Sequence, residues 1–385
     1  MTTAYSLTSP LDERLCQVIA SQGGWIPFDA FMNEALYAPG LGYYARQTPK
    51  FGSLPYVRQN GQMVAGSDFV TAPEMSPLFG YTLAQQVAQA LQFSGTQEVW
   101  EFGAGSGALA QQVITALQAQ GVVLRRYVIV ELSASLRERQ QQALQHVAPG
   151  LVQWVDALPE SIEGVVLGNE VLDAMPVKLL MRRQGVWHER GVRLGTLTGA
   201  AQAAALPLFA WQDRITPLRP PLEIEGEHDY LTEIHPQAES FMRTLAERLT
   251  AGAAFFIDYG FPEHEYYHPQ RHMGTVMCHQ AHLADADPLA RVGQKDITAH
   301  VNFTGIALAA QDAGLEVLGY CSQARFLLNC GLAEHMQASD LTQRVQAQRL
   351  VMEHEMGELF KVIGLCRGEP WAARGFAQGD RTHTL

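Results

Sequence analysis

Gly103, Gly105 and Gly107 alternate along the chain and form the segment best suited to holding a ligand. Residues 99–102 predict the end of a buried strand, and apolar residues at helical spacing follow from Leu109. A strand that breaks into glycines and continues as a helix brings bare backbone N–H groups against a ligand. The alternative is a glycine-rich turn of an α/β protein without a binding role.

Two classes of cofactor use such a turn: the nicotinamide and flavin dinucleotides, and S-adenosylmethionine. Gly103, Gly105 and Ala108 also satisfy the dinucleotide pattern G-x-G-x-x-G/A, so spacing alone does not separate the classes. Glu131 ends the next apolar segment, where an acid hydrogen-bonds ribose hydroxyls in either class. The alternating glycines, Glu101 within the strand and the long segment before it favour S-adenosylmethionine.

An amide and two carboxylates, Asn169, Glu170 and Asp173, follow the apolar run at residues 165–167. Ligands bind beyond the carboxyl ends of strands in an open α/β sheet, so these side chains and Asp258 are expected beside the glycine turn. Helix capping by Asn169, with Glu170 as an acid in the first turn, is the alternative.

The elements that must position these residues alternate between strand and helix from residue 97 to 168, as a parallel sheet requires. A hairpin is expected over 177–193 with its turn at Gln184-Gly185. An Ala- and Pro-rich loop follows at 199–221. Further strands are expected at 230–235 and 253–258, and helices at 237–250 and 305–313. The closing strands are expected at 315–321 and 359–366. The last fifteen or so residues are polar and are expected to fray.

Charge and cysteine content limit the class of protein. The formal net charge of −12 argues against nucleic-acid binding. It suits a cationic partner, or it only keeps the protein soluble. Five scattered cysteines without a C-x-x-C pair indicate reduced thiols, with neither disulfides nor a zinc site. The sequence shows no leader pattern and no apolar run long enough for membrane insertion, which predicts a bacterial cytoplasmic protein.

The chain resembles the MidA family of S-adenosylmethionine-dependent methyltransferases, the group that contains the mitochondrial complex I assembly methyltransferase. The matching segments run in order through nearly the whole chain, at 36–44, 66–80, 101–110, 168–177, 256–260, 296–304, 323–331 and 357–364. Residues 276–280 depart from the family's usual Arg- and Tyr-containing version.

This resemblance implies an α/β fold of the class I methyltransferase (Rossmann-like) type, a seven-stranded sheet in which 359–366 forms the one antiparallel strand. The expected organisation begins with an N-terminal helical cap at 1–95. A methyltransferase core at 96–366 follows, with an inserted β-rich segment at about 177–250 and a substrate loop at about 260–300. A polar tail occupies 367–385.

The resemblance also implies a set of contacts to S-adenosyl-L-methionine. Gly103, Ala104, Gly105 and Gly107 would surround the methionine portion, Glu131 would bind the ribose, and Asp156 and Ala157 would flank the adenine. Asn169 would lie beside the transferred methyl group, and Thr71, Pro73 and Glu74 would close the cap over the cofactor. Leu132 is also expected among the cofactor contacts.

The mitochondrial members of the family methylate an arginine of a complex I subunit, which implies an arginine-bearing protein substrate here. A guanidinium is a poor nucleophile because its lone pair is delocalised, and a carboxylate pair can bind it and expose one nitrogen to the methyl group. We expect Glu170 and Asp173 to form this clamp and Asp258 to accept the proton.

Three alternatives remain at this stage: a cofactor-binding assembly factor that docks a respiratory subunit, a methyltransferase acting on a small molecule, and a dinucleotide oxidoreductase. Aromatic residues that could line a peptide channel, or simply pack, are Tyr43, Tyr44, Phe69, Tyr259 and Phe303. Six histidines between 264 and 300 lack metal-ligand spacing and predict a surface or substrate-loop cluster without a metal.

Overall fold

The computed structural model describes residues 9–45, 57–59, 62–64, 70–147, 149–195 and 208–385. The chain folds into two compact units, each assembled from three separate stretches. Unit 1 comprises Met1–Arg46, Ala174–Gln237 and His264–Ala299, and unit 2 comprises Gln47–Asp173, Ala238–Glu263 and His300–Leu385.

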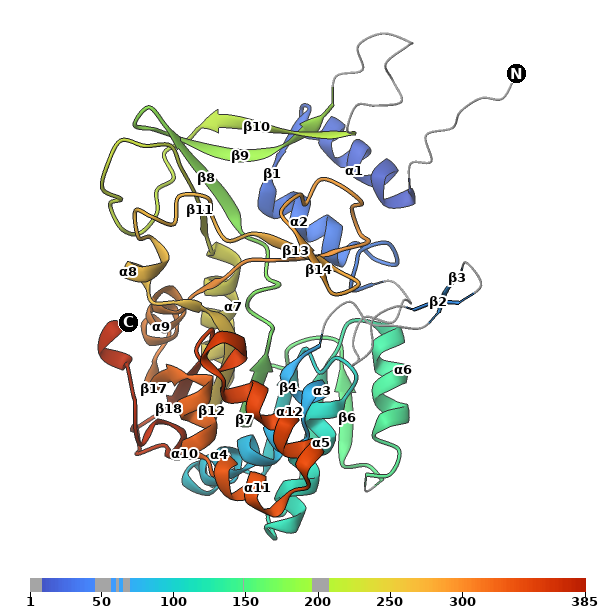
Figure 1. Ribbon diagram of the computed structural model, residues 1–385, viewed down its shortest axis with the longest axis vertical. Helices are drawn as coiled ribbons and strands as arrows, with labels where there is room; N and C mark the ends of the chain where they lie inside the picture. Colours follow the sequence, from blue (N-terminus) through green and yellow to red (C-terminus); the bar gives the residue numbers. More distant parts are fainter. Residues whose placement is uncertain (1–8, 46–56, 60–61, 65–69, 148, 196–207) are drawn as a thin grey trace. The chain divides into compact units, whose positions relative to one another are not determined.

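The main sheet of unit 2 has the strand order β17-β18-β12-β7-β4-β5-β6 (Figure 1). Its strands are β4 (Glu98–Phe102), β5 (Arg126–Val130), β6 (Val152–Val155), β7 (Ile162–Asn169), β12 (Leu249–Phe261), β17 (Leu315–Ser322) and β18 (Phe360–Arg367). Only β18 runs antiparallel to its neighbours within this order. The short β16 (Val301–Asn302) pairs with the end of β12. This is the seven-stranded class I methyltransferase sheet predicted above.

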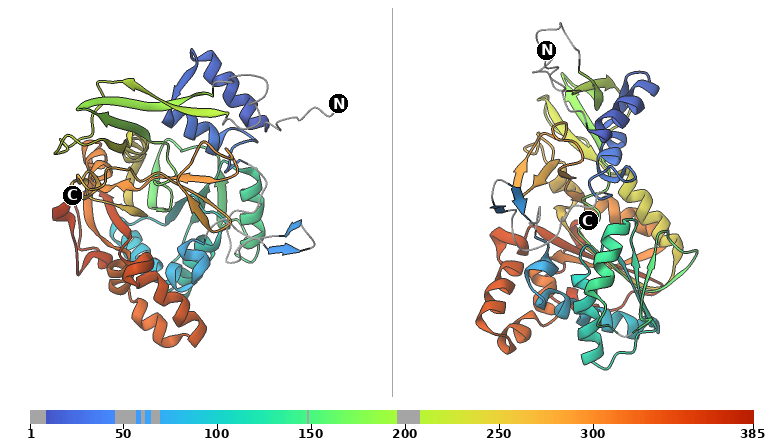
Figure 2. Two further views of the ribbon diagram at one scale, coloured as in Figure 1. Left: turned by 45° about the horizontal axis from the view of Figure 1, so that its top comes forward. Right: turned by 90° about the vertical axis from the view of Figure 1, so that its right-hand side faces the viewer.

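Helices cover both faces of this sheet because successive side chains of a strand point to opposite sides (Figure 2). Phe255 of β12 belongs to the core that includes Leu83 of α4 (Leu78–Ser94). Phe256 points the other way, where its ring meets Phe241 of α7 (Pro236–Arg248) at 6.1 Å.

Each of the remaining α-helices of unit 2 in the described residues begins at a polar or glycine N-cap residue. These helices and short turns are α3 (Ala72–Met75), α5 (Ala108–Ala119), α6 (Ala134–Ala143), α9 (Phe303–Asp312), α10 (Gln323–Asn329), α11 (Leu332–Ala338), α12 (Leu341–Val351), η1 (Glu353–Gly357), η2 (Arg374–Phe376) and η3 (Thr382–Thr384). The side chains of Ser133, Asn302 and Asp340 each accept a backbone N–H at the start of the helix that follows, which satisfies one of its unpaired donors.

Unit 1 is built on an antiparallel sheet of five strands. These are β1 (Trp25–Pro27), β8 (Lys178–Arg183), β9 (Val186–Leu194), β10 (Phe209–Ile215) and β11 (Tyr230–Ile234). The predicted hairpin turn is confirmed: Gln184 and Gly185 have φ of 49° and 77°, the left-handed pair that a two-residue hairpin loop uses.

The other elements of unit 1 are α1 (Pro10–Ser21), α2 (Phe28–Tyr37), α8 (Glu263–Tyr266) at its border, and a small sheet of β13 (Met277–Gln280), β14 (Leu283–Asp285) and β15 (Asp296–Thr298). A two-stranded ribbon of β2 (Val57–Gln59) and β3 (Gln62–Val64) lies in the segment assigned to unit 2. None of the helices in the described residues is long and apolar enough to span a bilayer.

This division differs from the domain organisation expected from the sequence. Helix α4 falls in the expected cap of 1–95, yet it lies in unit 2, where its Leu83 and Val87 share one core with Val99. The expected insertion and the expected substrate loop each lie largely in unit 1, together with the first 46 residues.

The C-terminal segment, expected to fray, is instead packed. Phe376 is only 7% exposed, and its ring lies 5.4 Å from that of Phe326. Two strand glycines leave it room: a Cβ on Gly319 or Gly364 would come within 2.2 Å or 2.5 Å of its ring carbons. The carboxylate of Asp380 also accepts the backbone N–H of Tyr320, so this segment is part of the fold.

Candidate active site

The glycine turn after β4 has a backbone that other residues would adopt only with strain. Gly103, Gly105 and Gly107 have φ of 64°, 53° and 89°, in the left-handed region. The N–H of Gly107 donates to the carbonyl of Ala104 at 2.8 Å and closes the turn at the start of α5. A Cβ on Gly103 would come within 2.9 Å of Val171 Cγ2, which places this turn directly against the residues that follow β7.

Glu101 lies beneath the turn with its carboxylate buried on β4. It is 1% exposed, and the hydroxyl of Tyr127 donates to Oε2 at 2.6 Å. Burial raises the pKa of Glu101 to about 7; the Tyr127 hydrogen bond opposes this rise and the charge of Glu131 adds to it. Glu101 therefore takes up a proton far more readily than an exposed glutamate.

Glu131 follows β5, the neighbour of β4. Its Oε1 accepts the backbone N–H of Ser133 at 2.8 Å, and its Oε2 accepts the side-chain amide of Gln140 at 2.9 Å. Leu132 beside it is 77% exposed. Asp156 and Ala157 are exposed after β6, the next strand of the sheet. Because the three strands are parallel, these residues share one edge of the sheet with the glycine turn.

Helix α3 is tied to the glycine turn by two polar side chains. Ser106 donates its hydroxyl to the carboxylate of Glu74. Gln112 of α5 donates to the carbonyl of Pro73 at 2.8 Å and accepts the N–H of Gly80 at 3.1 Å. Thr71 is the N-cap residue of α3. The structure thus brings Glu74 to the glycine turn and Pro73 to the helix that follows it.

The segment after β7 is held in an unusual conformation. Glu170 has a φ of 54°, which costs a non-glycine residue about 1–2 kcal/mol. Its N–H donates to Ile257 O on β12 at 2.9 Å. Oδ2 of Asp258 accepts the backbone N–H groups of residues 171, 172 and 173 at 3.1, 2.9 and 3.2 Å. These bonds fix the path of the turn.

Three carboxylates meet at this turn. The hydroxyl of Tyr259 donates to Asp173 Oδ2 at 2.5 Å, and Asp173 is 5% exposed. Burial first, and then the charges of Asp173 and Glu170, raise the pKa of Asp258 well above its usual value. A site with these charges favours a cationic ligand.

The role expected for Asp258 changes with this geometry. The hydrogen bonds found for it in the described residues all come from backbone N–H groups, including that of Tyr259 at 2.9 Å to Oδ1. Both of its oxygens are therefore committed to the backbone. Asp258 anchors the turn, and the geometry does not favour it as the proton acceptor.

Asn169 ends β7 at the same edge of the sheet. It is 8% exposed; its Nδ2 donates to Glu170 Oε1 at 3.2 Å, and its Oδ1 is buried with no hydrogen-bond partner among the described residues. A buried acceptor without a donor is costly unless a ligand or water supplies one. Asn169 is therefore suited to accept a hydrogen bond from a bound ligand.

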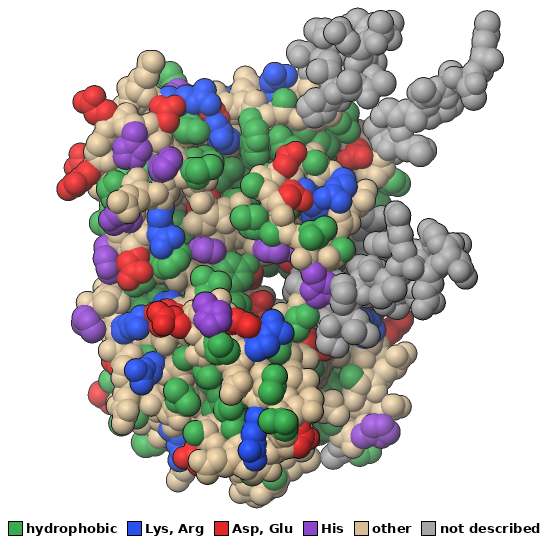
Figure 3. Space-filling model, in the orientation of Figure 1, with side chains coloured by type: hydrophobic (Ala, Val, Ile, Leu, Met, Phe, Trp, Pro, Cys, Tyr) green, Lys and Arg blue, Asp and Glu red, His purple; other side chains and the backbone are tan. Residues whose placement is uncertain are grey.

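The aromatic and histidine predictions have mixed outcomes. Phe303 is fully buried against Tyr320, as packing predicts, whereas Tyr259 contacts the acidic turn. Tyr43 and Tyr44 lie in unit 1, and Phe69 lies outside the described residues. Figure 3 shows histidines spread over the visible face of the molecule. The described residues contain no group of His, Cys, Asp and Glu that could hold a metal ion.

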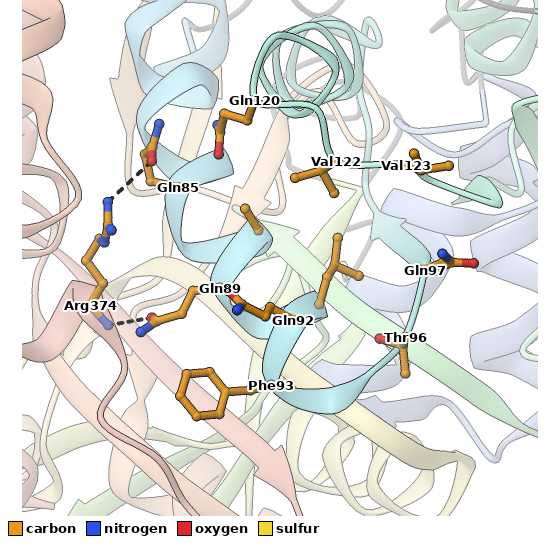
Figure 4. Close-up of a pocket in the computed structure, with 12 residues that line it drawn as sticks. Gln85, Gln89, Gln92, Phe93, Thr96, Gln97, Gln120, Val122, Val123 and Arg374 are labelled. Carbon is orange, nitrogen blue, oxygen red and sulfur yellow. Dashed lines mark hydrogen bonds between the residues drawn. The ribbon is translucent and has the colours of Figure 1, made fainter.

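A surface groove of about 620 Å³ lies elsewhere on unit 2. Thr96 and Gln97 line it immediately before β4 begins, so it lies at the amino-terminal edge of the sheet. Figure 4 shows Arg374 at one side, bonded to Gln85 and Gln89 of α4. None of the predicted site residues lines this groove.

Three contacts could not be seen in the sequence: those of Ser106 to Glu74, Gln140 to Glu131, and Tyr259 to Asp173. The sequence suggested Tyr259 only as one of several channel aromatics. Of these residues, Ser106 itself could have been singled out from the sequence, although its contact could not, because it has the one polar side chain between Gly103 and Gly107.

Comparison with known proteins identifies the family of this chain. A family model described as "Putative S-adenosyl-L-methionine-dependent methyltransferase" matches residues 82–321. A crystal structure of a superfamily member from Burkholderia thailandensis, bound to S-adenosyl-homocysteine, is 49% identical with a TM-score of 0.88, and the match covers 98% of this chain and 99% of that one. A native structure of a protein from the same species is 48% identical with a TM-score of 0.85, covering 98% and 99%.

More distant relatives carry a more specific name. "Protein arginine methyltransferase NDUFAF7, mitochondrial" of Danio rerio is 26% identical over 93% of this chain and 88% of the relative. The Homo sapiens protein of that name is 26% identical over 93% and 83%. Together with the bound S-adenosyl-homocysteine, these matches confirm the family, the fold and the cofactor class predicted from the sequence.

Proposed function

The chain belongs to the family of S-adenosyl-L-methionine-dependent methyltransferases whose model it matches, and from this membership we propose that it methylates an arginine guanidinium of a protein substrate. The observation that carries the proposal is the meeting of Glu170, Asp173 and Asp258 at the turn after β7. The distant relatives named as arginine methyltransferases support it.

The residues at the sheet edge fit the cofactor. The turn from Gly103 to Gly107 offers backbone N–H groups to its amino-acid part, Glu131 offers carboxylate oxygens to its ribose, and Leu132 with Asp156 and Ala157 would flank its adenine. The bound cofactor supplies an electrophilic methyl group on a positively charged sulfur. Asn169 Oδ1 would accept a hydrogen bond beside that group.

The acidic turn would bind and orient the guanidinium. A carboxylate and a guanidinium form paired, charge-assisted hydrogen bonds, which hold the planar group in one orientation. Glu170 and Asp173 would form these bonds, with Tyr259 holding Asp173 and with Asp258 holding the backbone that carries both acids. Alignment of nitrogen, methyl carbon and sulfur can supply about 7–11 kcal/mol of the acceleration.

Transfer of the methyl group requires one proton to leave the attacked nitrogen. The nitrogen–carbon bond forms as the carbon–sulfur bond breaks, the sulfur becomes neutral, and the proton passes to a carboxylate. We assign this step to Glu170, because it is half-buried and can pass the proton on to water, whereas Asp173 and Asp258 are buried.

The test uses cell lysate, labelled S-adenosylmethionine and the Glu170→Gln variant. We expect a labelled methyl-arginine in a protein, found by mass spectrometry, and a loss of at least tenfold in labelling by Glu170→Gln. The matched control is Glu163→Gln, because Glu163 is exposed near the start of β7, the strand that Glu170 follows. A respiratory subunit is the first protein to look for, given the family resemblance.

Two results would redirect the proposal. Label in a small molecule or in lysine would overturn the arginine assignment while leaving the family unchanged. Full biological function in a Glu170→Gln strain without methyl transfer would favour a cofactor-binding assembly factor.

A further inference from the structure

Gln140 makes hydrogen bonds at the ends of three successive strands of unit 2. Its Nε2 donates to the carbonyl of Gly105 at 3.0 Å and to Glu131 Oε2 at 2.9 Å. Its Oε1 accepts the indole N–H of Trp154 at 3.0 Å. Gly105 follows β4, Glu131 follows β5 and Trp154 belongs to β6, so one amide links all three.

The surroundings hold this amide in a single orientation. Gln140 is fully buried on α6, which runs beside β6 in Figure 1. Its Cα would lie only 3.4 Å from a Cβ on Gly107, so the helix packs tightly on the glycine turn. Both amide hydrogens have acceptors and the amide oxygen has a donor. Rotation of the amide by half a turn would set its oxygen against the Glu131 carboxylate.

We propose that Gln140 is a positioning residue that orients the Glu131 carboxylate toward the cofactor ribose and thereby sets the enzyme's preference for ribose over deoxyribose. This inference rests on the ribose contact of Glu131 in the proposed function. Glu131 Oε1 is held by the N–H of Ser133 and Oε2 by Gln140, so the two donors together fix the plane of the carboxylate. Removing one donor lets that plane turn.

The competing explanation is that Gln140 only fills space between α6 and the sheet. If Gln140 is purely structural, its substitution should weaken the binding of every adenosine ligand alike. If Gln140 orients Glu131, its substitution should weaken the binding only of ligands that carry the hydroxyl groups bound by Glu131. Ligands with and without a ribose hydroxyl therefore separate the two explanations.

The experiment measures, by calorimetry, the affinity of the full chain for S-adenosyl-homocysteine and for its 2′-deoxy and 3′-deoxy analogues. Gln140→Met removes the hydrogen bonds at nearly constant volume, and Gln140→Glu keeps the shape but replaces the donor by an acceptor. The control is Gln141→Met, because Gln141 is exposed on the same helix.

We expect the unmodified protein to bind S-adenosyl-homocysteine at least about tenfold more tightly than one of the two deoxy analogues, since a hydrogen bond to a charged group is worth about 1.5–3 kcal/mol. Both Gln140 variants should lose most of this preference, with affinity for that analogue nearly unchanged. Gln141→Met should keep the preference.

Each other outcome points to a particular failure. Equal losses for all three ligands in the Gln140 variants would overturn the positioning role. An unmodified protein without preference for the ribose would instead show that Glu131 does not bind the ribose hydroxyls, which is a failure of the proposed cofactor contact.

Discussion

Replacing Glu101 by glutamine should make the stability of the protein less dependent on pH. The folded chain raises the pKa of this buried carboxyl from 4.5 to about 7. Such a rise corresponds to about 3 kcal/mol, because a tenfold change in proton affinity is worth about 1.4 kcal/mol. Glutamine keeps the size of the side chain and an oxygen that can accept the Tyr127 hydroxyl, but it has no proton to lose.

The sign of the pH dependence of stability follows from which state, folded or unfolded, binds the proton. Between pH 4.5 and about 7 the folded chain keeps Glu101 protonated while the unfolded chain has released that proton. The free energy of unfolding contributed by Glu101 therefore falls as the pH rises through this window and is level above it. Relative to the unmodified protein, Glu101→Gln should gain up to about 3 kcal/mol between pH 4.5 and pH 8.

The assay is urea unfolding at several pH values, followed by tryptophan fluorescence, because Trp100 is buried on the same strand. Glu163→Gln, at an exposed position, is the matched control: it keeps Glu101 and should therefore keep the pH dependence of the unmodified protein. A stability difference between Glu101→Gln and the unmodified protein that stays constant from pH 4.5 to pH 8 would refute the reasoning. It would mean that the carboxyl reaches water or a cation.

Three further substitutions test other contacts. Gly103→Ala should weaken S-adenosyl-homocysteine binding at least tenfold in calorimetry, because the new Cβ meets Val171 Cγ2 and the φ of 64° costs about 1–2 kcal/mol; unchanged affinity would place the ligand elsewhere. Tyr259→Phe should lower the methylation rate about tenfold and leave cofactor affinity unchanged, since it removes the hydrogen bond to Asp173 and keeps the ring; a change in cofactor affinity with a normal rate would contradict this. Phe376→Ala should destabilise the chain by about 3–5 kcal/mol in thermal unfolding, and a loss below 1 kcal/mol would show that the C-terminal segment is not part of the core.

Local signals predicted the glycine turn after β4. Gly103 and Gly107 need a left-handed backbone, which few other residues tolerate, so the turn was evident from residue type alone. The alternation of strands and helices likewise predicted a parallel sheet. The seven strands of the sheet and the reversed β18 came from the family resemblance.

Contacts between distant parts of the chain were beyond the sequence. Tyr259 and Asp173 are 86 residues apart, and no periodicity links them. The backbone hydrogen bonds to Asp258 depend on the left-handed backbone conformation of Glu170. Glutamate is not a residue type that predicts this conformation. Phe376 is a single aromatic in a polar segment, and its burial depends on the two glycines that make room for it.

The position of β18 has a consequence for biosynthesis. This strand is the last of the sheet in the chain, yet it lies between β12 and β17. Until it leaves the ribosome, β12 lacks its neighbour on that side and β17 has no partner in the sheet, and unpaired strand edges invite aggregation. A nascent chain of this protein should therefore depend on chaperones until its final residues emerge, and truncations near the C-terminus should be recovered as aggregates.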